Sequence, residues 1–305
     1  MISIRNIVKK FPTVVALNSI SLEIKEKEFF GLLGPNGAGK STLINLLVGY
    51  EKADSGVISV AGDTVTHDNL SVRKKIGLIP QSIALYGDLN ALQNLEIFGS
   101  LFDIDKSILS RRIGESLNSV GLYERRKDAV KTFSGGMKRR LNLIAGMLHD
   151  PPILLCDEPT VGVDPQSRNA IFDYLTLLNE QGKTIVYTTH YMEEAERLCN
   201  RIAIIDSGTI ITVGTLAEIL NRFPGGETIQ IEKNPATLKH KSLYDGFGSV
   251  TERNDQFEIA PQPGLQLSKF FASMEHHEID AKFITLTRPT LEYVFLQMTG
   301  KGLRD

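Results

Sequence analysis

The sequence predicts an α/β protein with a parallel-sheet core, an antiparallel β subdomain and a helical subdomain, followed by a small C-terminal α+β domain. Three observations carry this prediction. The first 30 residues alternate apolar and polar side chains, Phe29–Leu33 is continuously apolar and leads into a glycine-rich turn, and residues 82–148 follow a mainly helical pattern. With 305 residues, the chain is long enough for one large and one small domain.

The first elements are expected in a β-β-β-α order. Ser3–Val8 and Ile20–Ile24 alternate in character, which predicts antiparallel strands. Phe29–Leu33 has no polar position, as is typical of a parallel strand buried on both faces. The turn that follows leads into a predicted helix over Thr42–Val48.

Beyond residue 148, apolar runs predict the rest of the core. A helix with Gly182 at its C-cap is expected over Gln166–Gln181. Ser207-Gly208 is a hairpin signal between two flanking runs. The predicted strands are Ile153–Cys156, Thr184–Thr188, Ile202–Asp206 and Thr209–Val213.

A change of character at Phe223-Pro224-Gly225-Gly226 predicts the domain boundary, with one domain over residues 1–222 and a second over 223–305. The second domain contains no chemical motif. Its predicted elements are strands at Thr228–Ile231, Gln256–Ile259 and Lys282–Leu286, a helix at Leu265–Met274, and a final helix opened by Pro289.

Charge and hydropathy exclude two classes of partner. The formal net charge is −2, so bulk electrostatics does not indicate nucleic acid. The basic clusters Arg125-Arg126-Lys127 and Lys138-Arg139-Arg140 are interpreted as solvated helix faces. No apolar run approaches the roughly 20 residues that a bilayer-crossing helix needs, so the chain is not expected to span a membrane.

The glycine-rich turn is the first motif that indicates chemistry. It matches G-x-x-x-x-G-K-[ST] in full, between an apolar strand and a helical run, and so predicts a P-loop NTPase core. The glycines let backbone N–H groups point at phosphate oxygens, and the helix start adds its positive dipole end. The expected nucleotide-binding residues are Gly34, Pro35, Asn36, Gly37, Ala38, Gly39, Lys40, Ser41 and Thr42.

Two roles within this turn follow from side-chain chemistry. Lys40 supplies a point charge near the β- and γ-phosphates, and the Ser41 hydroxyl can ligate Mg²⁺. ATP and Mg²⁺ are therefore the expected cofactors.

An acidic pair ends the strand that begins at Ile153. Asp157 can hold magnesium through a water, and Glu158 can polarise an attacking water. Alone, such a pair would be an ordinary strand end at the surface. Its position downstream of a complete phosphate loop favours the functional interpretation.

A second anion site is indicated by Ser134-Gly135-Gly136 at the start of a helical run. Taken alone, the tripeptide is more often a simple helix cap. Because the chain already has a phosphate loop, a second anion site is explained if two copies meet head to tail. Each copy then offers this helix start to the γ-phosphate held by the other.

Taken together in this order, the motifs resemble the nucleotide-binding subunit of an ATP-binding cassette (ABC) transporter over about residues 1–220. The resemblance implies Walker A for the glycine-rich turn and Walker B ending at Asp157. It further implies catalytic roles for Glu158 and for the switch histidine His190. Gln81 is the implied Q-loop glutamine, which joins the magnesium site to movement of the helical subdomain.

Two further residues are assigned through the resemblance alone. Asp164 matches the D-loop aspartate, which contacts the partner subunit. Phe11 lies where the family places an aromatic that stacks on adenine, although a core or hairpin role fits this residue equally well.

The sequence is most similar to the export cassettes for drugs, antibiotics and lipids. The signature helix continues Met137-Lys138-Arg139-Arg140-Leu141, and the tail contains Pro289-Thr290-Leu291-Glu292 followed by Tyr293-Val294-Phe295. The signature departs from the commoner pattern at Phe133 and Met137, and the D-loop reads Val161-Gly162-Val163-Asp164.

The resemblance implies an ATPase subunit that dimerises, as a homodimer, and docks on integral-membrane permease subunits through about residues 83–102. This places it in the cytoplasm at the inner face of the membrane. Three alternatives stay open: a soluble cassette ATPase acting on ribosomes or DNA, the ATPase of a nutrient importer, and a binding module with a dead site.

Overall fold

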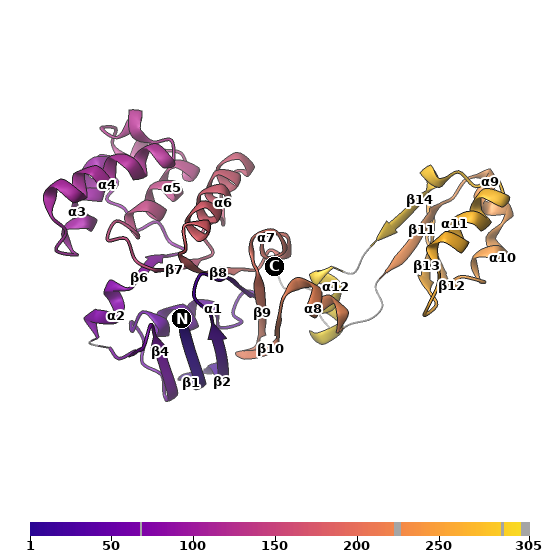
Figure 1. The fold of residues 1–305 in the computed structure, drawn as a ribbon, viewed down its shortest axis with the longest axis horizontal. Helices are drawn as coiled ribbons and strands as arrows, with labels where there is room; N and C mark the ends of the chain where they lie inside the picture. The colour runs from indigo at the N-terminus through magenta and orange to yellow at the C-terminus, as the bar shows by residue number, and fades with distance from the viewer. Residues whose placement is uncertain (68, 223–226, 288–289, 300–305) are drawn as a thin grey trace. The chain divides into compact units, whose positions relative to one another are not determined.

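The structure is a computed structural model that describes residues 1–67, 69–222, 227–287 and 290–299. The chain divides into two compact units, Met1–Leu216 and Ala217–Gly302. The predicted boundary after residue 222 adjoins residues 223–226, which lie outside the described residues, so it stays a prediction. Figure 1 shows the elements of each unit.

An antiparallel sheet begins the first unit, as the alternating pattern predicts. Its strand order is β2-β1-β4-β5. β1 pairs with β2 over a longer stretch than expected, from Ile2 opposite Ile24 to Phe11 opposite Val14. The strands are β1 Ile2–Phe11, β2 Val14–Ile24, β4 Ser55–Val60 and β5 Asp63–Thr64.

The central sheet has the order β10-β9-β3-β8-β7-β6 within the described residues. β3, β6, β7, β8 and β9 run parallel, and β10 returns antiparallel as the predicted hairpin partner of β9. The strands are β3 Phe29–Leu33, β6 Ile76–Ile79, β7 Ile153–Asp157, β8 Thr184–Thr189, β9 Arg201–Asp206 and β10 Thr209–Gly214.

The continuous apolar runs of these strands arise because both faces of the sheet are covered. On β7, Leu154 and Cys156 belong to a cluster with the helical side of the unit. Ile153 and Leu155 belong to a second cluster with α1 and the antiparallel sheet. Neighbouring residues of one strand thus serve two different cores.

Helices cover the central sheet, and some of them form a separate subdomain beyond it. In Figure 1, α3, α4 and α5 gather beyond β6 and β7 and form the predicted helical subdomain. Gly182 follows α6 with a φ of 95°, as expected for its C-terminal cap. The helices are α1 Lys40–Leu47, α2 Leu70–Lys74, α3 Ala91–Ser100, α4 Lys106–Ser119, α5 Gly135–Ala145, α6 Pro165–Glu180 and α7 Met192–Leu198, with 3₁₀ turns at Tyr123–Arg125 and Val130–Thr132.

The second unit is the predicted α+β unit, with the sheet order β12-β13-β11-β14. Tyr244, Phe257 and Phe270 are buried in its core. Pro289, the predicted start of the final helix, lies outside the described residues. The elements are α8 Leu216–Asn221, β11 Thr228–Glu232, α9 Pro235–Lys239, α10 Lys241–Tyr244, β12 Gly248–Glu252, β13 Gln256–Pro261, α11 Leu267–His276, a 3₁₀ turn Ala281–Phe283, β14 Ile284–Thr287 and α12 Leu291–Thr299.

Within the described part of the chain, none of the helices combines the length and the apolar character that crossing a membrane requires.

Candidate nucleotide site

The candidate site lies where β3, β7 and β8 end. These strands are neighbours in the parallel sheet, so the residues that follow them meet at one edge. The glycine-rich turn follows β3, Glu158 follows β7 and His190 follows β8. Gln81 joins them from the segment after β6.

The turn after β3 has the backbone that a phosphate cradle needs. Gly37 and Gly39 have φ angles of 81° and 108°, in the region that favours glycine. A Cβ on Gly39 would lie 2.6 Å from the Ala16 carbonyl oxygen, and a Cβ on Gly34 would lie 2.2 Å from that of Ile205. Glycine is therefore required here by packing as well as by conformation.

Lys40 is buried at the start of α1. Its ammonium group donates to the carbonyl oxygens of Gly34 at 2.8 Å and Pro35 at 3.0 Å. Its Nζ also lies 3.0 Å from Glu158 Oε1, and both side chains are only 4% exposed. Removal of either Lys40 or Glu158 would leave the charge of the other buried and unpaired, which is strongly destabilising.

Glu158 has an unusual backbone that aims its side chain at this cavity. Its φ is 43°, a left-handed conformation that disfavours residues with a Cβ. The Glu158 N–H donates to Thr188 Oγ1 at 2.9 Å, and this hydroxyl donates to Asp157 Oδ1 at 2.7 Å. Thr188, near the end of the buried strand β8, therefore orients both acidic residues, and no sequence signal indicated this role.

Gln81 and His190 meet at the other oxygen of Glu158. Gln81 Nε2 donates to Glu158 Oε2 at 3.1 Å. His190 Nδ1 lies 3.3 Å from the same oxygen, close enough for an ion pair when the imidazole is protonated, although the angle is not that of a hydrogen bond. Four residues that are far apart in the sequence are thus brought into contact around one carboxylate.

A cavity of about 630 Å³ opens beside this cluster. Phe11 and Val14 form its apolar rim, at the turn between β1 and β2. Phe11 is 38% exposed and its ring lies 5.0 Å from the Lys9 ammonium, so it is not a core residue. The lining residues are Phe11, Val14, Ala16, Asn36, Gly37, Gly39, Lys40, Ser41, Thr42, Gln81, Glu158, Val161 and His190.

The signature residues lie apart from this cavity and do not line it. Ser134 caps α5 by accepting a hydrogen bond from the Met137 N–H at 3.2 Å. Asp164 caps α6 by accepting from the Ser167 N–H at 2.9 Å. A Cβ on Gly136 would lie 2.1 Å from Ser167 Oγ, so the two helix starts are in close contact.

Arg139 is buried. The interpretation of Lys138-Arg139-Arg140 as a solvated helix face was therefore wrong for Arg139. This side chain is 5% exposed, and burial lowers the pKa of its guanidinium. It donates to the carbonyl oxygens of Gln81 at 2.5 Å and Val161 at 3.2 Å. Arg139 therefore links the signature helix to two loops of the site. A run of three cations does not reveal that its middle member faces inward.

Comparisons with known proteins agree with this geometry. Residues 17–161 match the family described as ABC transporter. The chain is 41% identical to the linearmycin resistance ATP-binding protein LnrL of Bacillus subtilis, with all of both chains covered. It is 35% identical to the doxorubicin resistance ATP-binding protein DrrA of Mycobacterium tuberculosis, over 94% of this chain and 89% of that one.

A third relative and two solved structures give the same result. The Nod factor export ATP-binding protein I of Cupriavidus pinatubonensis is 34% identical, over 100% of this chain and 92% of its own. The structure of an ATP-binding subunit of an ABC transporter superposes with a TM-score of 0.67 at 26% identity, over 73% and 93% of the two chains. A dimeric, post-hydrolysis cassette bound to ADP and Pi has a TM-score of 0.64 at 28% identity, over 71% and 99%.

Proposed function

Because this chain belongs to the ABC transporter family and is an ATP-hydrolysing subunit of it, we propose that it energises export of a drug-, antibiotic- or lipid-like compound through a separate permease at the inner face of the cell membrane. The relatives' names support the export direction, since linearmycin resistance, doxorubicin resistance and Nod factor export occur among proteins matched over nearly their full length. A soluble cassette acting on ribosomes or DNA is not favoured by any of these names.

The observation that carries the proposed mechanism is the contact of Lys40, Gln81 and His190 with one carboxylate, that of Glu158. A γ-phosphate is the natural partner of Lys40. When phosphate oxygens bind its ammonium group, Glu158 is released and can accept a proton from water. His190 is placed to hold the γ-phosphate and to orient Glu158 as it does so.

Three oxygen donors at this edge of the sheet suit magnesium. Ser41 and Gln81 line the cavity, whereas Asp157 ends β7 next to Glu158 and is not among the lining residues. The Ser41 hydroxyl, the Gln81 side-chain carbonyl and the Asp157 carboxylate are the hard ligands that Mg²⁺ prefers. The Thr188 hydroxyl holds Asp157 in place through its hydrogen bond at 2.7 Å. We assign these three residues to Mg²⁺, which when bound would neutralise charge on the phosphates.

We assign Ser134, Gly135 and Gly136 to the ATP of a second copy in a homodimer. They lie outside the cavity of their own chain, and they begin α5, whose first backbone N–H groups can bind an anion. Asp164 at the adjacent helix start would face the partner subunit. The dimeric cassette bound to ADP and Pi supports this arrangement.

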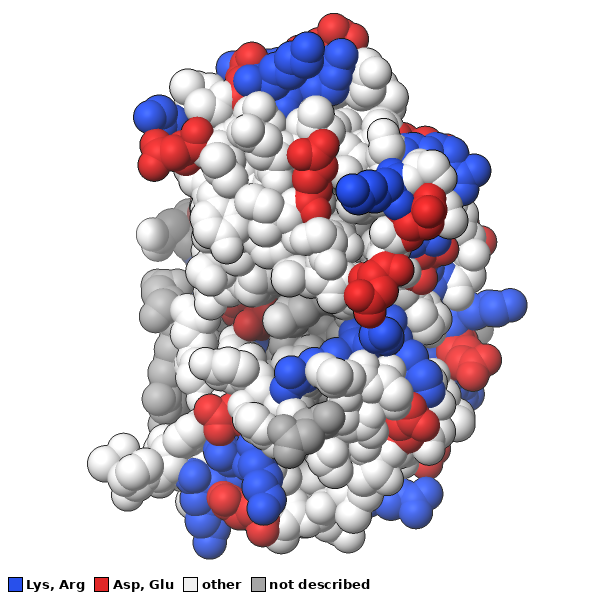
Figure 2. All heavy atoms as spheres, turned by 90° about the vertical axis from the view of Figure 1, so that its left-hand side faces the viewer, with Lys and Arg blue, Asp and Glu red and all other residues white. Residues whose placement is uncertain are grey.

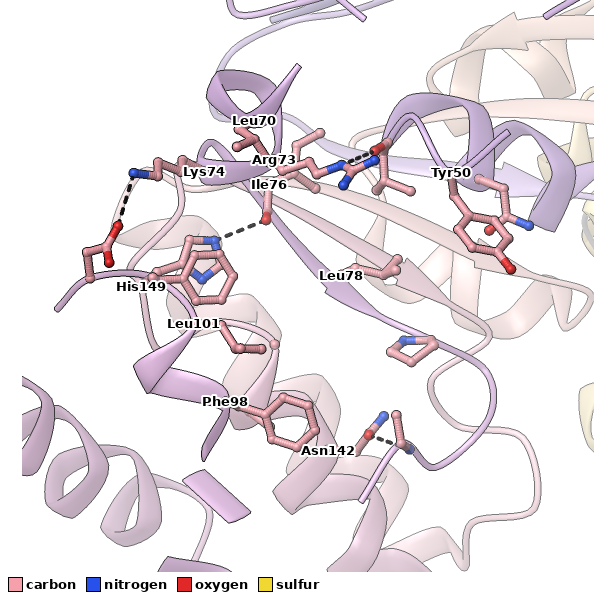
Figure 3. A pocket seen from close by; sticks show the side chains of 18 residues that line it. Tyr50, Leu70, Arg73, Lys74, Ile76, Leu78, Phe98, Leu101, Asn142 and His149 are labelled. Atoms are coloured by element: carbon pink, nitrogen blue, oxygen red, sulfur yellow. Dashed lines mark hydrogen bonds and ion pairs between the residues drawn. The ribbon is translucent and has the colours of Figure 1, made fainter. Parts of the chain in front are cut away.

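A groove next to the segment that follows β6 and contains Gln81 is the proposed docking site of the permease. It has a volume of about 820 Å³ and lies between α2, β6 and the helical subdomain. Figure 3 shows Ile76, Leu78, Phe98 and Leu101 lining it. Figure 2 shows uncharged surface over much of the face on this side, with acidic and basic residues across its middle as well as at its edges. An apolar helix of a permease would bury this surface.

Two polar side chains of the groove, those of Asn142 and His149, each form a hydrogen bond with the backbone. Asn142 Oδ1 accepts a hydrogen bond from the Ala84 N–H at 3.0 Å. His149 Nε2 donates to the Ile76 carbonyl oxygen at 3.0 Å, and its ring stacks on Phe102 at 3.8 Å. Burial lowers the pKa of His149, so the groove floor stays uncharged at neutral pH. The permease would therefore meet an apolar and neutral floor, together with the charged side chains of Arg73, Lys74 and Asp103, which also line the groove.

The test is purification of the tagged chain from detergent-solubilised membranes, followed by expression with its co-purifying permease in a drug-sensitive host. We expect increased resistance to linearmycin or doxorubicin, and loss of this resistance in Glu158→Gln. Co-purification of ribosomes or DNA without any integral-membrane protein would favour the soluble alternative. Resistance that Glu158→Gln leaves unchanged would refute energy coupling through this site.

A further inference from the structure

Glu194 is a buried carboxylate that the nucleotide site does not contain, yet it contacts the elements that carry the site. It lies on α7 and its side chain is 4% exposed. Three hydroxyl groups surround it, from Thr160 at 2.8 Å, Tyr187 at 3.0 Å and Thr189 at 2.7 Å. A buried carboxylate needs such partners, since burial without them would strongly destabilise its charge.

The direction of these hydrogen bonds is fixed by chemistry. An ionised carboxylate only accepts, so each hydroxyl must donate its single proton to Glu194. The buried Tyr187 phenol remains protonated for this purpose, because burial and the nearby carboxylate raise its pKa well above the usual value. Arg168 of α6 supplies opposite charge, with Nε 3.8 Å from Oε1 of Glu194.

The bond to Thr189 reaches the backbone on both sides of His190. Thr189 immediately precedes His190, and its proton is directed to Glu194. Its Oγ1 is thereby left to accept the N–H of Tyr191, at 2.9 Å, which immediately follows His190. The centroid of the His190 imidazole lies 4.1 Å from that of the Tyr191 ring. The Arg168 guanidinium lies 5.5 Å from the centroid of the same Tyr191 ring.

The bond to Thr160 reaches the other half of the site. Thr160 is two residues after Glu158, in the turn where the Val161 N–H donates to the Glu158 carbonyl oxygen at 3.4 Å. One carboxylate thus holds the turn after β7 and the turn after β8 at a fixed separation.

We propose that Glu194 is a positioning residue for ATP hydrolysis, which sets the geometry of His190 relative to Glu158 without contacting nucleotide. The inference rests on the proposed roles of Glu158 and His190. Loss of the Glu194 carboxylate leaves each turn folded but removes the hydrogen bonds that fix the distance between the two turns. Because small displacements of catalytic groups slow reactions strongly, Glu194→Ala should lower kcat about 10- to 100-fold, with KM for ATP changed less than about 3-fold.

The experiment is a double-mutant cycle in steady-state ATP hydrolysis by the full chain, with Glu194→Ala, His190→Ala and the double variant. If Glu194 acts through His190, the double variant should have about the same kcat as His190→Ala alone. A general loss of packing would instead multiply the two effects. Multiplied effects would overturn the inference, whereas a His190→Ala variant with unchanged kcat would refute the proposed role of His190 itself.

Glu28 provides a matched control, because it is also a buried carboxylate, at the opposite end of β3. It accepts from Arg201 Nη1 at 2.8 Å and from the Lys25 N–H at 2.7 Å. Glu28→Ala should lower the melting temperature but change kcat less than about 2-fold, because neither of these two side-chain partners belongs to the site. A loss of kcat equal to that of Glu194→Ala would refute the special role of Glu194.

A second variant covers the case in which Glu194→Ala does not fold. Thr189→Val keeps the shape of the side chain and leaves Glu194 bonded to Thr160 and Tyr187, but removes the link to Tyr191. It should lower kcat about 10-fold with little change in KM for ATP, and no further in the His190→Ala background. Wild-type kcat in a folded Thr189→Val protein would overturn the inference.

Discussion

The contact between Gly136 and Ser167 gives a quantitative test of the structure. A Cβ added to Gly136 would lie 2.1 Å from Ser167 Oγ and 2.5 Å from Ser167 Cβ. Such separations fall short of the ordinary carbon contact distance by more than about 1 Å. Gly136→Ala must therefore push the start of α5 away from the start of α6, or displace Ser167. Overpacking of this kind costs about 1–3 kcal/mol.

Gly135 is the matched control. A Cβ there would meet nothing closer than the Gly162 carbonyl oxygen, at 3.9 Å. Both glycines lie in the first turn of α5, so replacement by alanine gives both variants a similar gain in helix propensity. The difference in the free energy of unfolding between the two variants then isolates the overlap, at about 1–3 kcal/mol. For a unit of this size it corresponds to a melting temperature about 2–12 °C lower for Gly136→Ala.

The assay is thermal unfolding without nucleotide, followed by circular dichroism, for both variants in the wild-type and Ser167→Gly backgrounds. Ser167→Gly removes the two nearest clashing atoms and leaves only Asp164 Oδ2, at 2.9 Å from the added Cβ. The hydrogen bond from the N–H of residue 167 to Asp164 is kept, because it uses the backbone. In that background the difference in melting temperature between the two alanine variants should fall to less than half of its wild-type-background value, because only the contact with Asp164 Oδ2 remains. Equal melting of Gly136→Ala and Gly135→Ala in the wild-type background would refute the close approach of the two helices.

The remaining predictions concern the nucleotide. Glu158→Gln should bind ATP at least as tightly as wild type, because it removes a charge that competes for Lys40, and should nearly abolish turnover; steady-state hydrolysis near the wild-type rate would contradict this. Lys40→Ala should weaken binding of a fluorescent ATP analogue at least 10-fold, and unchanged affinity in an equilibrium titration would count against the cradle. Ser134→Arg in the Glu158→Gln background should bind ATP as a monomer but fail to dimerise in size exclusion, since its charge would enter the partner's phosphate site. Deletion of residues 223–305 should leave a folded, ATP-binding cassette, and loss of ATP binding in a protein that circular dichroism shows to be folded would overturn the domain boundary.

The sequence predicted the elements whose pattern is local and strong. Phe29–Leu33 was recognisable because a strand covered on both faces has no polar position. The hairpin of β9 and β10 was recognisable because Ser207 and Gly208 adopt positive φ angles of 47° and 75°. By contrast, β12 was missed because it is an edge strand with mainly exposed Ser, Thr and Glu side chains. α9 was missed because a five-residue helix carries too short a pattern.

For the candidate site, the residue types could be predicted from the sequence, but the contacts between them could not. Gln81 and Glu158 are 77 residues apart, and only the parallel order of β6, β7 and β8 brings them to one hydrogen bond of 3.1 Å. Arg139 was misinterpreted for the same reason, because helical periodicity identifies a face only when it is known what packs there. Such contacts depend on strand order, which no local pattern encodes.

The contacts around the Glu158 carboxylate explain why three other side chains meet at this one group. Lys40 and Glu158 form a buried ion pair. In the proposed mechanism this pair opens when phosphate binds, and the freed carboxylate then needs other partners, because an unpaired buried charge is strongly destabilising. Gln81 and His190 already contact the second oxygen of Glu158, so its carboxylate can leave Lys40 without becoming isolated. The backbone carbonyl oxygen of Gln81 in turn accepts a hydrogen bond from Arg139 of the signature helix. In the proposed mechanism, opening of the ion pair by ATP is thereby linked to the helical subdomain, which carries the proposed dimer signature and lines one side of the proposed permease groove.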